Sequence, residues 1–450
     1  MMATIKLMLI SRLSLALGIS LALAAAIFAV AWQYRDVRLI GDPIEQSRDV
    51  TFAVGADGTA PQSLHAPFAF IAVDEATFDA LGRPDHTPHD RIAALLLQVA
   101  AAHPVAIVLD LDITWTAPAS EDKALDDALR QLGEHGVPVL LLREVRAGPS
   151  DRAPYALPLS RFDALVAKYP SLEWVVASAP RNGDDTVRAV LPFVRVCRGG
   201  QPLYLPGVGV AAAQAYSAAA THSKPATVIF PAADWSCAPG AARPSGKVRL
   251  RGPIATGGAP LTALAPVAPI RFTLKWPGDS AVSAQTLTDL RGKTRPLYAV
   301  LSARPFMGSA SNGSLASWTQ GAIAVIGASH ADARDIYATP LGRMPGSFII
   351  VNLIRALLDF GPDSGVEWQG ALLSMLLLSA ITAVATVWLE RYLSTWLELF
   401  LPFAITGIWW LVLTLTTGGS GYFALAFTQF IVSLVVRLVP PVRDKRGEAP

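Results

Sequence analysis

Four long apolar stretches near the two ends of the chain restrict its fold more than any other feature. Residues 13–32 contain no charged side chain, and three further apolar stretches occupy residues 370–389, 396–417 and 422–438. A helix of about 20 apolar residues is long enough to cross the hydrocarbon core of a bilayer, which is about 30 Å thick. The sequence therefore predicts four transmembrane helices, one before and three after the central residues 34–369.

The composition of the chain agrees with a membrane protein. Hydrophobic residues make up 52% of the 450 residues and charged residues only 16%, whereas charged residues are about 25% of a typical soluble protein. The formal net charge is +2 and no basic block stands out, so the sequence does not indicate binding to a phosphate backbone. We expect the lipid bilayer to be a partner of the chain, and nucleic acid not to be one.

Basic residues next to the apolar stretches predict the orientation of the chain in the membrane. Three groups fall on one side of it: Lys6 with Arg12, Arg391, and Arg443 with Lys445 and Arg446. Because lysine and arginine near membrane ends mark the cytoplasmic side, we expect residues 1–12 and the tail 439–450 to be cytoplasmic. Residues 34–369 would then face the periplasm of a bacterial inner membrane.

A cleavable signal peptide is the alternative for the first apolar stretch. Residues 29–31 are Ala-Val-Ala, which is similar to a small-residue cleavage site. The apolar part of a signal peptide usually has about 7–15 residues, and residues 13–32 form a longer run. The length favours a retained helix.

The first part of the central segment predicts an α/β fold. Apolar runs at residues 68–75, 105–112 and 136–145 indicate strands, and amphipathic patterns at residues 89–104 and 121–133 indicate helices between them. The second helix is expected to end at its last residue, a glycine. Strands that alternate with helices imply a mostly parallel sheet with right-handed crossovers.

The pattern then weakens and returns near the end of the segment. Residues 178–320 are rich in glycine, proline and alanine and show only short runs typical of strands. Residues 322–329 again predict a buried strand, followed by a long loop at 330–346 and a helix at 347–361 that leads to the second apolar stretch.

The second predicted strand ends on two carboxylates, Asp110 and Asp112, followed by Thr114. This pattern resembles the first motif of the haloacid dehalogenase phosphatases. On an extended strand the two carboxylates share one face, which would suit Mg²⁺. A phosphatase also needs a distal acidic pair, which residues 183–185 could mimic, and a placed lysine, which is not evident. The alternative is that these carboxylates accept hydrogen bonds from loop or helix N-terminal amides. We expect Asp112 to be structural in this way, with buried donors as its partners, and Asp110 to be dispensable for any activity.

Two histidine motifs are weaker candidates for a metal site or a catalytic site. His86 and His89 flank a proline and could hold Zn²⁺, but no distant third ligand is evident and a solvated loop is the favoured interpretation. Ser329 and His330 are adjacent, and adjacent residues on an extended chain point apart, so they do not form a nucleophile and its base. We therefore expect no catalytic residue, no metal site and no cofactor.

Cys197 and Cys237 are the two cysteines of the chain. Both lie in the segment that we assign to the periplasm, where disulfides form and persist. The sequence leaves open whether they are bonded, because their separation in the fold does not follow from it.

Several motifs follow one another along the central segment: FAFIAVDEATFDALGR (68–83), LDITWTAP (111–118), EDKALDDAL (121–129), DDTVRAVLPFVRV (184–196), VRLRGP (248–253) and residues 324–358, which include DIYATP. These motifs and their order resemble those of the type-2 CHASE sensor domains of bacterial receptors. The resemblance makes five residues candidates for ligand binding or for fixing a loop: Asp74, Glu75, Asp112, Asp335 and Thr339. Residues 84–91 depart from the family pattern, because only Pro88 matches there.

The resemblance implies a sensor rather than an enzyme. The outer domain would detect a small molecule or an envelope component, and the predicted membrane helices would pass the change to a partner protein or to a second copy of the chain. Only residues 439–450 follow the last predicted helix, so we expect no fused transmitter. The alternative function is a periplasmic metal-dependent phosphatase that uses Asp110 and Asp112.

Overall fold

The computed structural model describes residues 66–360, with gaps at 147–154, 180–184, 225–226, 230–236, 238–247, 255–260, 265–266, 271 and 309–313. The chain divides into two units, and all described residues belong to the one that comprises Ala56–Asp363. The four predicted transmembrane segments lie outside the described residues. Within the described ranges, no helix has both the length and the apolar character needed to cross a membrane.

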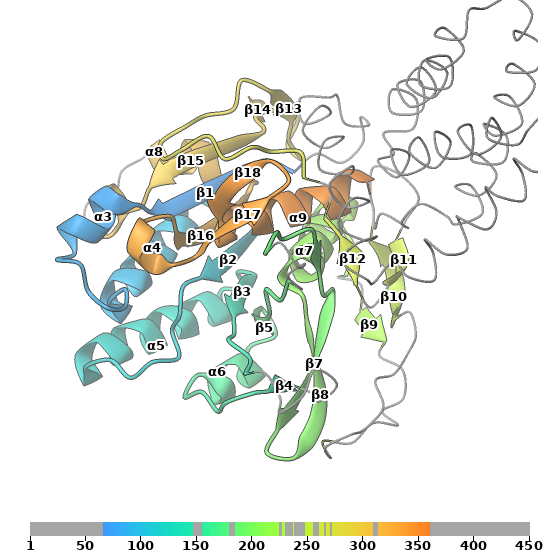
Figure 1. Cartoon of the computed structure of the whole chain (residues 1–450), viewed down its shortest axis with the longest axis horizontal. Helices are drawn as coiled ribbons and strands as arrows, with labels where there is room; N and C mark the ends of the chain where they lie inside the picture. Colours follow the sequence, from blue (N-terminus) through green and yellow to red (C-terminus); the bar gives the residue numbers. More distant parts are fainter. Residues whose placement is uncertain are drawn as a thin grey trace, which may run out of the picture. The chain divides into compact units, whose positions relative to one another are not determined.

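A six-stranded sheet forms the centre of the described unit (Figure 1). Neighbouring strands are parallel throughout, in the order β15-β1-β16-β2-β3-β5. The bounds of these strands are β1 (Phe68–Val73), β2 (Ala106–Asp110), β3 (Val139–Leu142), β5 (Leu172–Val175), β15 (Tyr298–Ser302) and β16 (Ile323–Ala328). The predicted mostly parallel α/β sheet is therefore confirmed.

Strand β16 lies inside the sheet, between β1 and β2, although it is the last of the six sheet strands along the chain. Ile323 pairs with Phe68 of β1 on one side and with Ala106 of β2 on the other. All but the last residue of β16 are buried, and every residue of β1 is buried. Such uninterrupted apolar strands are typical of a parallel sheet that is covered on both faces.

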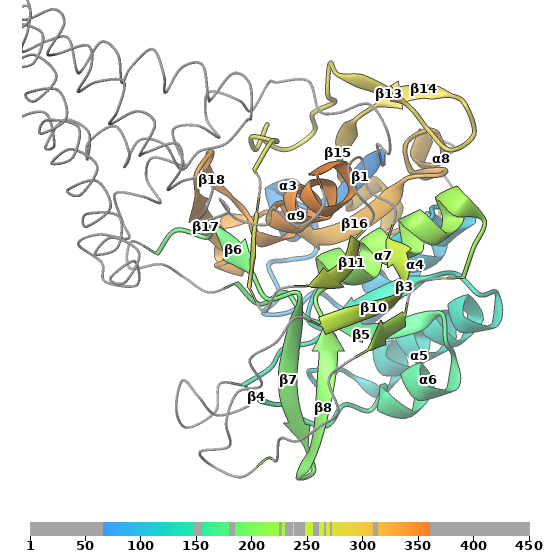
Figure 2. The same ribbon diagram turned by 90° about the vertical axis from the view of Figure 1, so that its right-hand side faces the viewer.

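Helices cover the two faces of this sheet. Their bounds are α3 (Glu75–Ala80), α4 (His89–Ala101), α5 (Ala119–Glu134), α6 (Asp163–Lys168), α7 (Val208–Thr221), α8 (Ser314–Thr319) and α9 (Gly346–Phe360), with short 3-10 turns η1 (Arg304–Phe306) and η2 (Ala331–Ala333). Figures 1 and 2 show α4 and α5 on one side of the sheet, and α7 beside α9 on the other.

The alternation of side chains along the strands explains these two layers. Ile71, Leu109 and Leu141 point to one face and pack with α4 and α5 in a single apolar core. On the opposite face, Phe70 of β1 contacts Phe348 of α9, with ring centroids 6.0 Å apart. Each helix layer therefore buries one set of alternate strand residues.

Two helices differ from the sequence-based prediction. Gly133 does not end α5; the helix runs to Glu134, and Gly133 is needed inside it because a Cβ atom there would overlap the ring of Tyr169. Helix α7 lies in the stretch that shows little periodicity. Its sequence is rich in alanine and most of its residues are buried, so no polar face produces a 3.6-residue pattern.

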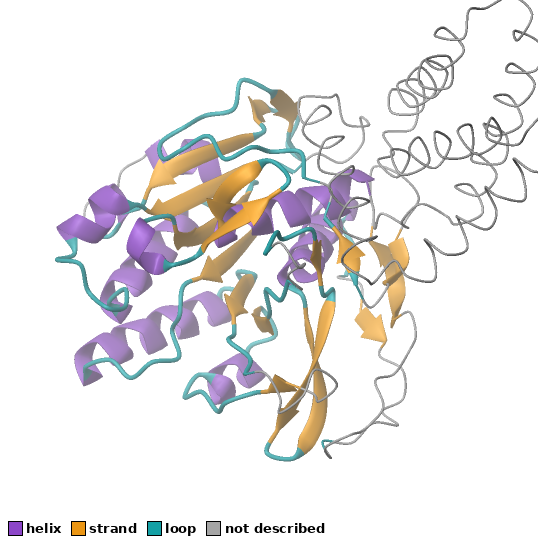
Figure 3. Cartoon of the chain, in the orientation of Figure 1, coloured by secondary structure: helices purple, strands orange, loops and turns teal. Residues whose placement is uncertain are grey.

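Further short strands lie outside the central sheet. They form small sheets of β4 (Tyr155–Ala156), β7 (Phe193–Arg198) and β8 (Gln201–Pro206); of β9 (Thr227–Ile229), β10 (Val248–Ile254) and β11 (Leu261–Leu264); and of the pairs β6 (Ala189–Val190) with β12 (Ala268–Pro269), β13 (Thr286–Thr288) with β14 (Thr294–Pro296), and β17 (Ile336–Thr339) with β18 (Gly342–Pro345). Figure 3 shows β7 and β8 extending away from the central sheet. The predicted loop at 330–346 is wrong in part, because it contains the β17–β18 hairpin.

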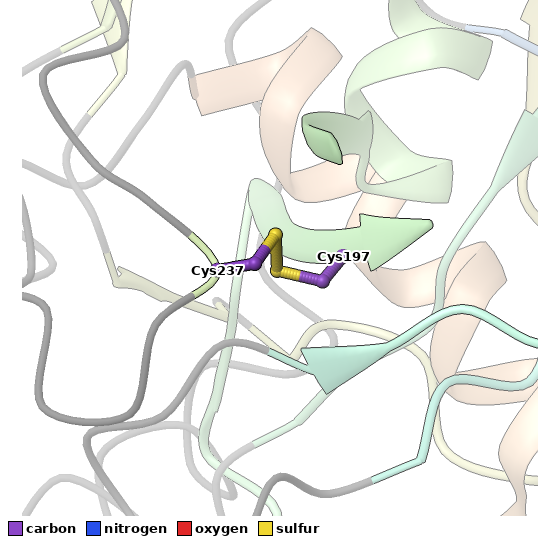
Figure 4. Close-up of a disulfide and its surroundings, with 2 residues drawn as sticks. All are labelled: Cys197 and Cys237. Carbon is purple, nitrogen blue, oxygen red and sulfur yellow. A yellow bond between two sulfur atoms is a disulfide. The ribbon is translucent and has the colours of Figure 1, made fainter. Parts of the chain in front are cut away.

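The structure joins Cys197, on β7, to Cys237 in a disulfide (Figure 4). Removing this bond should lower the free energy of unfolding by about 2–4 kcal/mol, because it links residues 40 positions apart and so restricts the unfolded chain. The measurement is denaturant unfolding of the full-length protein in detergent. The Cys197→Ser/Cys237→Ser variant should match the wild-type protein in reductant, and equal midpoints with and without the bond would contradict the expectation.

Candidate functional site

A cavity of about 1050 Å³ opens at the carboxyl ends of the central strands. Asp110 at the end of β2, Leu142 at the end of β3 and Ala328 at the end of β16 line it, together with residues of α7 and α9. Open α/β sheets bind their ligands at this edge, and the volume is near the upper end of the range for small-molecule sites. The cavity is the candidate binding site.

Asp110 contacts the start of α9 from the end of β2. The hydroxyl of Ser347, which is fully buried, donates a hydrogen bond of 2.6 Å to Oδ2 of Asp110. The helix can approach so closely because the neighbouring residue on β16 is Gly327, where a Cβ atom would overlap the side chain of Ser347. The first turn of α9 therefore rests directly on two strands.

Asp335 directly precedes β17 and contacts the same turn of α9. Its carboxyl group accepts hydrogen bonds from the backbone N–H groups of Gly346 and Ser347 and from the hydroxyl of Tyr337. Its carbonyl oxygen also accepts a hydrogen bond of 2.7 Å from the N–H of Gly346. Asp335 thus satisfies N–H groups that have no partner within the helix, and its charge suits the helix N-terminus.

The two carboxyl groups titrate near neutral pH. Burial raises the pKa of Asp110 to about 6, although the hydrogen bond from Ser347 opposes the shift. Burial, and after it the negative charge of Asp110, raises the pKa of Asp335 to about 7 against its hydrogen bonds. Between about pH 6 and pH 7 the pair therefore holds about one proton.

Asp112 accepts a hydrogen bond from a loop amide, as we expected, but its partners are not buried. It is exposed, and its Oδ1 accepts hydrogen bonds from the backbone N–H and the hydroxyl of Thr114, at 2.8 and 2.7 Å. The expectation that Asp112 satisfies buried donors is wrong, because its partners belong to its own exposed turn. Asp110 is instead the partly buried carboxylate, because it still lies on the strand and faces the start of α9.

The remaining candidates from the family motif do not line the cavity. Asp74 is buried at the start of α3, where it accepts hydrogen bonds from Thr77 and from the hydroxyl of Ser302. Glu75 is exposed and pairs with Arg83 at 2.6 Å. The hydroxyl of Thr339 donates to the carbonyl of Gly342 within the hairpin turn. The structure thus brings only Asp112 and Asp335 of the five to the cavity, and it adds Asp110.

The histidine motifs have separate structural partners. His89 is fully buried, so a solvated loop is wrong for it, and its Nδ1 lies 2.8 Å from Oδ1 of Asp122. Ser329 donates to Asp279 at 2.7 Å, whereas the ring of His330 stacks on Phe78. No group of three or more metal-ligating side chains that could hold an ion occurs among the described residues.

Ser347, Gly346 and Gly327 were not among the site residues predicted from the sequence. The signal for the first two was present, because a serine directly after Pro-Gly and before an apolar periodic run is typical of the first turn of a helix. Gly327 gave less of a signal, since a glycine inside an apolar strand indicates only that another part of the chain approaches closely.

The described unit is a parallel α/β domain with a cavity at the carboxyl ends of its strands, the edge at which open α/β sheets bind ligands. A model of the CHASE2 domain family matches residues 21–416, and the chain belongs to this family of extracellular sensory domains. The resemblance to type-2 CHASE domains is therefore confirmed. No curated protein and no solved structure matches the chain.

Proposed function

We propose that the chain is a membrane-anchored sensor that binds a small molecule or an envelope component in the cavity and relays its presence through α9. The observation that carries the proposal is the position of α9. Gly346, Ile349, Ile350, Leu353 and Leu357 line the cavity, and their spacing places them on one face of the helix. A ligand in the cavity would therefore contact α9 along most of its length.

The opposite side of α9 is anchored to the domain. Phe348 packs against Trp276 with ring centroids 5.0 Å apart, and against Phe70 and Tyr298. The side chain of Asn352 is bonded to the backbone of Leu274, accepting from its N–H at 2.8 Å and donating to its carbonyl at 3.0 Å. A ligand can shift the equilibrium between two positions of α9 only by the difference between its binding free energies for those two positions.

The relay would continue into the membrane. Helix α9 ends at Phe360, ten residues before the predicted span at 370–389. The family match begins inside the first predicted span and ends inside the third, which supports a domain placed between membrane segments. In this proposal the cavity is periplasmic, both termini are cytoplasmic, and the output is contact with a partner protein or with a second copy of the chain.

Filling the cavity from α9 tests the relay. Ile349 is buried and lines the cavity, so Ile349→Trp should act as a tethered occupant and change the cross-linking yield of residues 396–438 in membranes. Inserting three glycines after Asp363 should abolish this change, because a flexible connector cannot transmit a shift of the helix. The matched control is Leu159→Trp, since Leu159 is 79% exposed and lies outside the cavity. An Ile349→Trp effect that is absent, or that survives the glycine insertion, would reject the relay.

The phosphatase alternative gains no support from the site. Asp110 is bonded to Ser347 and has a raised pKa, whereas Asp112 is bonded to its own turn. A carboxyl group that is protonated near neutral pH is a poor nucleophile and a poor metal ligand. In the described part of the chain, no lysine lines the cavity.

A further inference from the structure

Two carboxyl groups from different strands hold the first two residues of α9. Asp110 binds the side chain of Ser347, and Asp335 binds the backbone N–H groups of Gly346 and Ser347. The fit is tight, because a Cβ atom on Gly346 would lie 2.6 Å from both carboxylate oxygens of Asp335. The end of β2, the start of the hairpin and the start of α9 therefore meet at one point.

This pair of carboxyl groups has no cationic partner among the described residues. Three buried carboxylates of the domain are paired with arginine: Asp163 with Arg143 at 2.6 Å, Asp289 with Arg295 at 2.6 Å, and Asp359 with Arg355 at 3.0 Å. Asp110 and Asp335 instead both contact the start of α9, where the charge on Asp110 opposes ionisation of Asp335. Only N–H and O–H donors offset the repulsion.

The other charged and titratable groups of the cavity are engaged elsewhere or lie on its rim. Arg83 binds Glu75, Asp79 and Asp332, and Arg143 binds Asp163. The groups that face the cavity are Arg83, Asp85 and His86 after α3, Asp112 after β2, Arg143, Glu144 and Tyr155 around β3 and β4, His330, Asp332 and Arg334 after β16, and Tyr337 on β17. Of these, Tyr337 is the one that contributes to the pKa of the pair, through its hydrogen bond to Asp335.

We propose that Asp110 and Asp335 form a proton-operated latch on α9. With a proton on the pair, the two carboxyl groups hold Gly346 and Ser347 against the ends of β2 and β16. Loss of the last proton, which leaves to solvent through the cavity, creates two negative charges at one point, and their repulsion loosens the first turn of α9. The latch itself does not depend on the proposed function. Only its effect on signalling rests on that function, because α9 is also the relay helix.

The direction of the pH effect follows from the raised pKa values. An unfolded aspartate has lost its proton above about pH 4, whereas the folded protein keeps protons on this pair up to about pH 6 and pH 7. The folded state therefore binds more protons between about pH 4 and pH 7, and the contribution of the pair to stability falls as the pH rises through this window. Above about pH 7 the pair causes no further change.

Hydrogen exchange of the full-length protein in membranes tests the latch without any ligand. After correction for the chemical exchange rate, the first turn of α9 should exchange about tenfold faster at pH 8 than at pH 5.5, since one pKa unit of differential interaction is a factor of ten. Asp335→Asn and Asp110→Asn keep the size of the side chain and stay neutral, so each should reduce the pH response. The double variant should remove it, because burial alone still raises the pKa of the carboxyl group that a single variant leaves. Asp112→Asn is the matched control, because Asp112 lines the same cavity but contacts only its own turn, and it should keep the response.

Two results would overturn the latch: equal protection of the wild-type protein at both pH values, or a pH response that is as large in the Asn variants as in the wild-type protein. If one Asn variant does not fold, the other decides. The latch and the relay fail separately. An absent pH response with an intact Ile349→Trp effect rejects the latch alone, and a pH response without an Ile349→Trp effect rejects the relay alone.

Discussion

Asp163→Ala should lower the free energy of unfolding by about 3–5 kcal/mol, because it leaves a buried guanidinium without its partner. The side chain of Arg143 is 1% exposed and donates to Asp163 at 2.6 Å. Its face lies over the ring of Trp174, with the guanidinium carbon 4.5 Å from the ring centroid. Arg143 also lines the cavity, so the loss of its partner should disturb the wall of the binding site as well.

An exposed ion pair provides the control for this variant. Asp127 contacts Lys123 and Arg130 on the surface of α5, and Asp127→Ala should change the stability by less than about 1 kcal/mol. Both variants are measured by denaturant unfolding of the full-length protein in detergent. Equal losses for the two variants would show that the Arg143–Asp163 pair contributes no more than a surface pair.

The Arg143–Asp163 pair also predicts how the protein responds to acid. Burial favours the neutral form of Asp163, but the bonds from Arg143 and Ser160 and the charge of Arg198 lower its pKa below the usual value. A lowered pKa stabilises the folded state above about pH 4, and this contribution is lost as the pH falls through the folded pKa. The difference between wild type and Asp163→Ala should therefore shrink in strong acid.

Gly327→Ala should lower the free energy of unfolding by about 2–3 kcal/mol, because overpacking of a tight contact forces neighbouring groups apart. A Cβ atom at this position would overlap the side chain of Ser347 and lie 3.4 Å from that of Asp110. The added methyl group should therefore push the first turn of α9 away from β16. Faster hydrogen exchange at residues 346–350 should accompany the loss of stability.

A glycine in open space provides the matched control. Nothing lies within 4 Å of a Cβ atom at Gly308, and Gly308→Ala should change the stability by less than about 0.5 kcal/mol. Adding Ser347→Gly to Gly327→Ala removes the overlapping side chain, so the double variant should be less destabilised than the sum of the single variants. Strict additivity would mean that the two residues are not in contact.

Local sequence pattern was sufficient for the elements with strong periodicity. The runs at 68–75, 105–112 and 322–329 contain β1, β2 and β16. A short uninterrupted apolar run is typical of a strand that is buried on both faces of a parallel sheet. Helix α4 was predicted at its observed start because Ile92, Leu95 and Val99 share a face. Helix α7 was not predicted, because its residues are mostly small and buried on nearly all sides.

The motif that identified the family was also sufficient to select Asp335 and Asp112 as residues of interest. It did not indicate Asp110, which the structure places against Ser347 at the start of α9. Asp110 and Asp112 have the same chemistry and nearly the same neighbours in sequence. Their difference arises from Ser347, which is 237 positions from Asp110 along the chain.

The sequence by itself determined the apolar segments, the alternation of strands and helices, and the family, because each depends on patterns within a few tens of residues. Only the tertiary structure decided that β16 enters between β1 and β2 and that α9 begins against their ends. That placement depends on contacts between residues that are far apart in the sequence. A local sequence pattern gives no information about the free energy of such contacts. The placement converts an ordinary carboxylate at the end of a strand into half of a partly buried acidic pair, since burial raises the pKa of Asp110 only once the chain has closed around it.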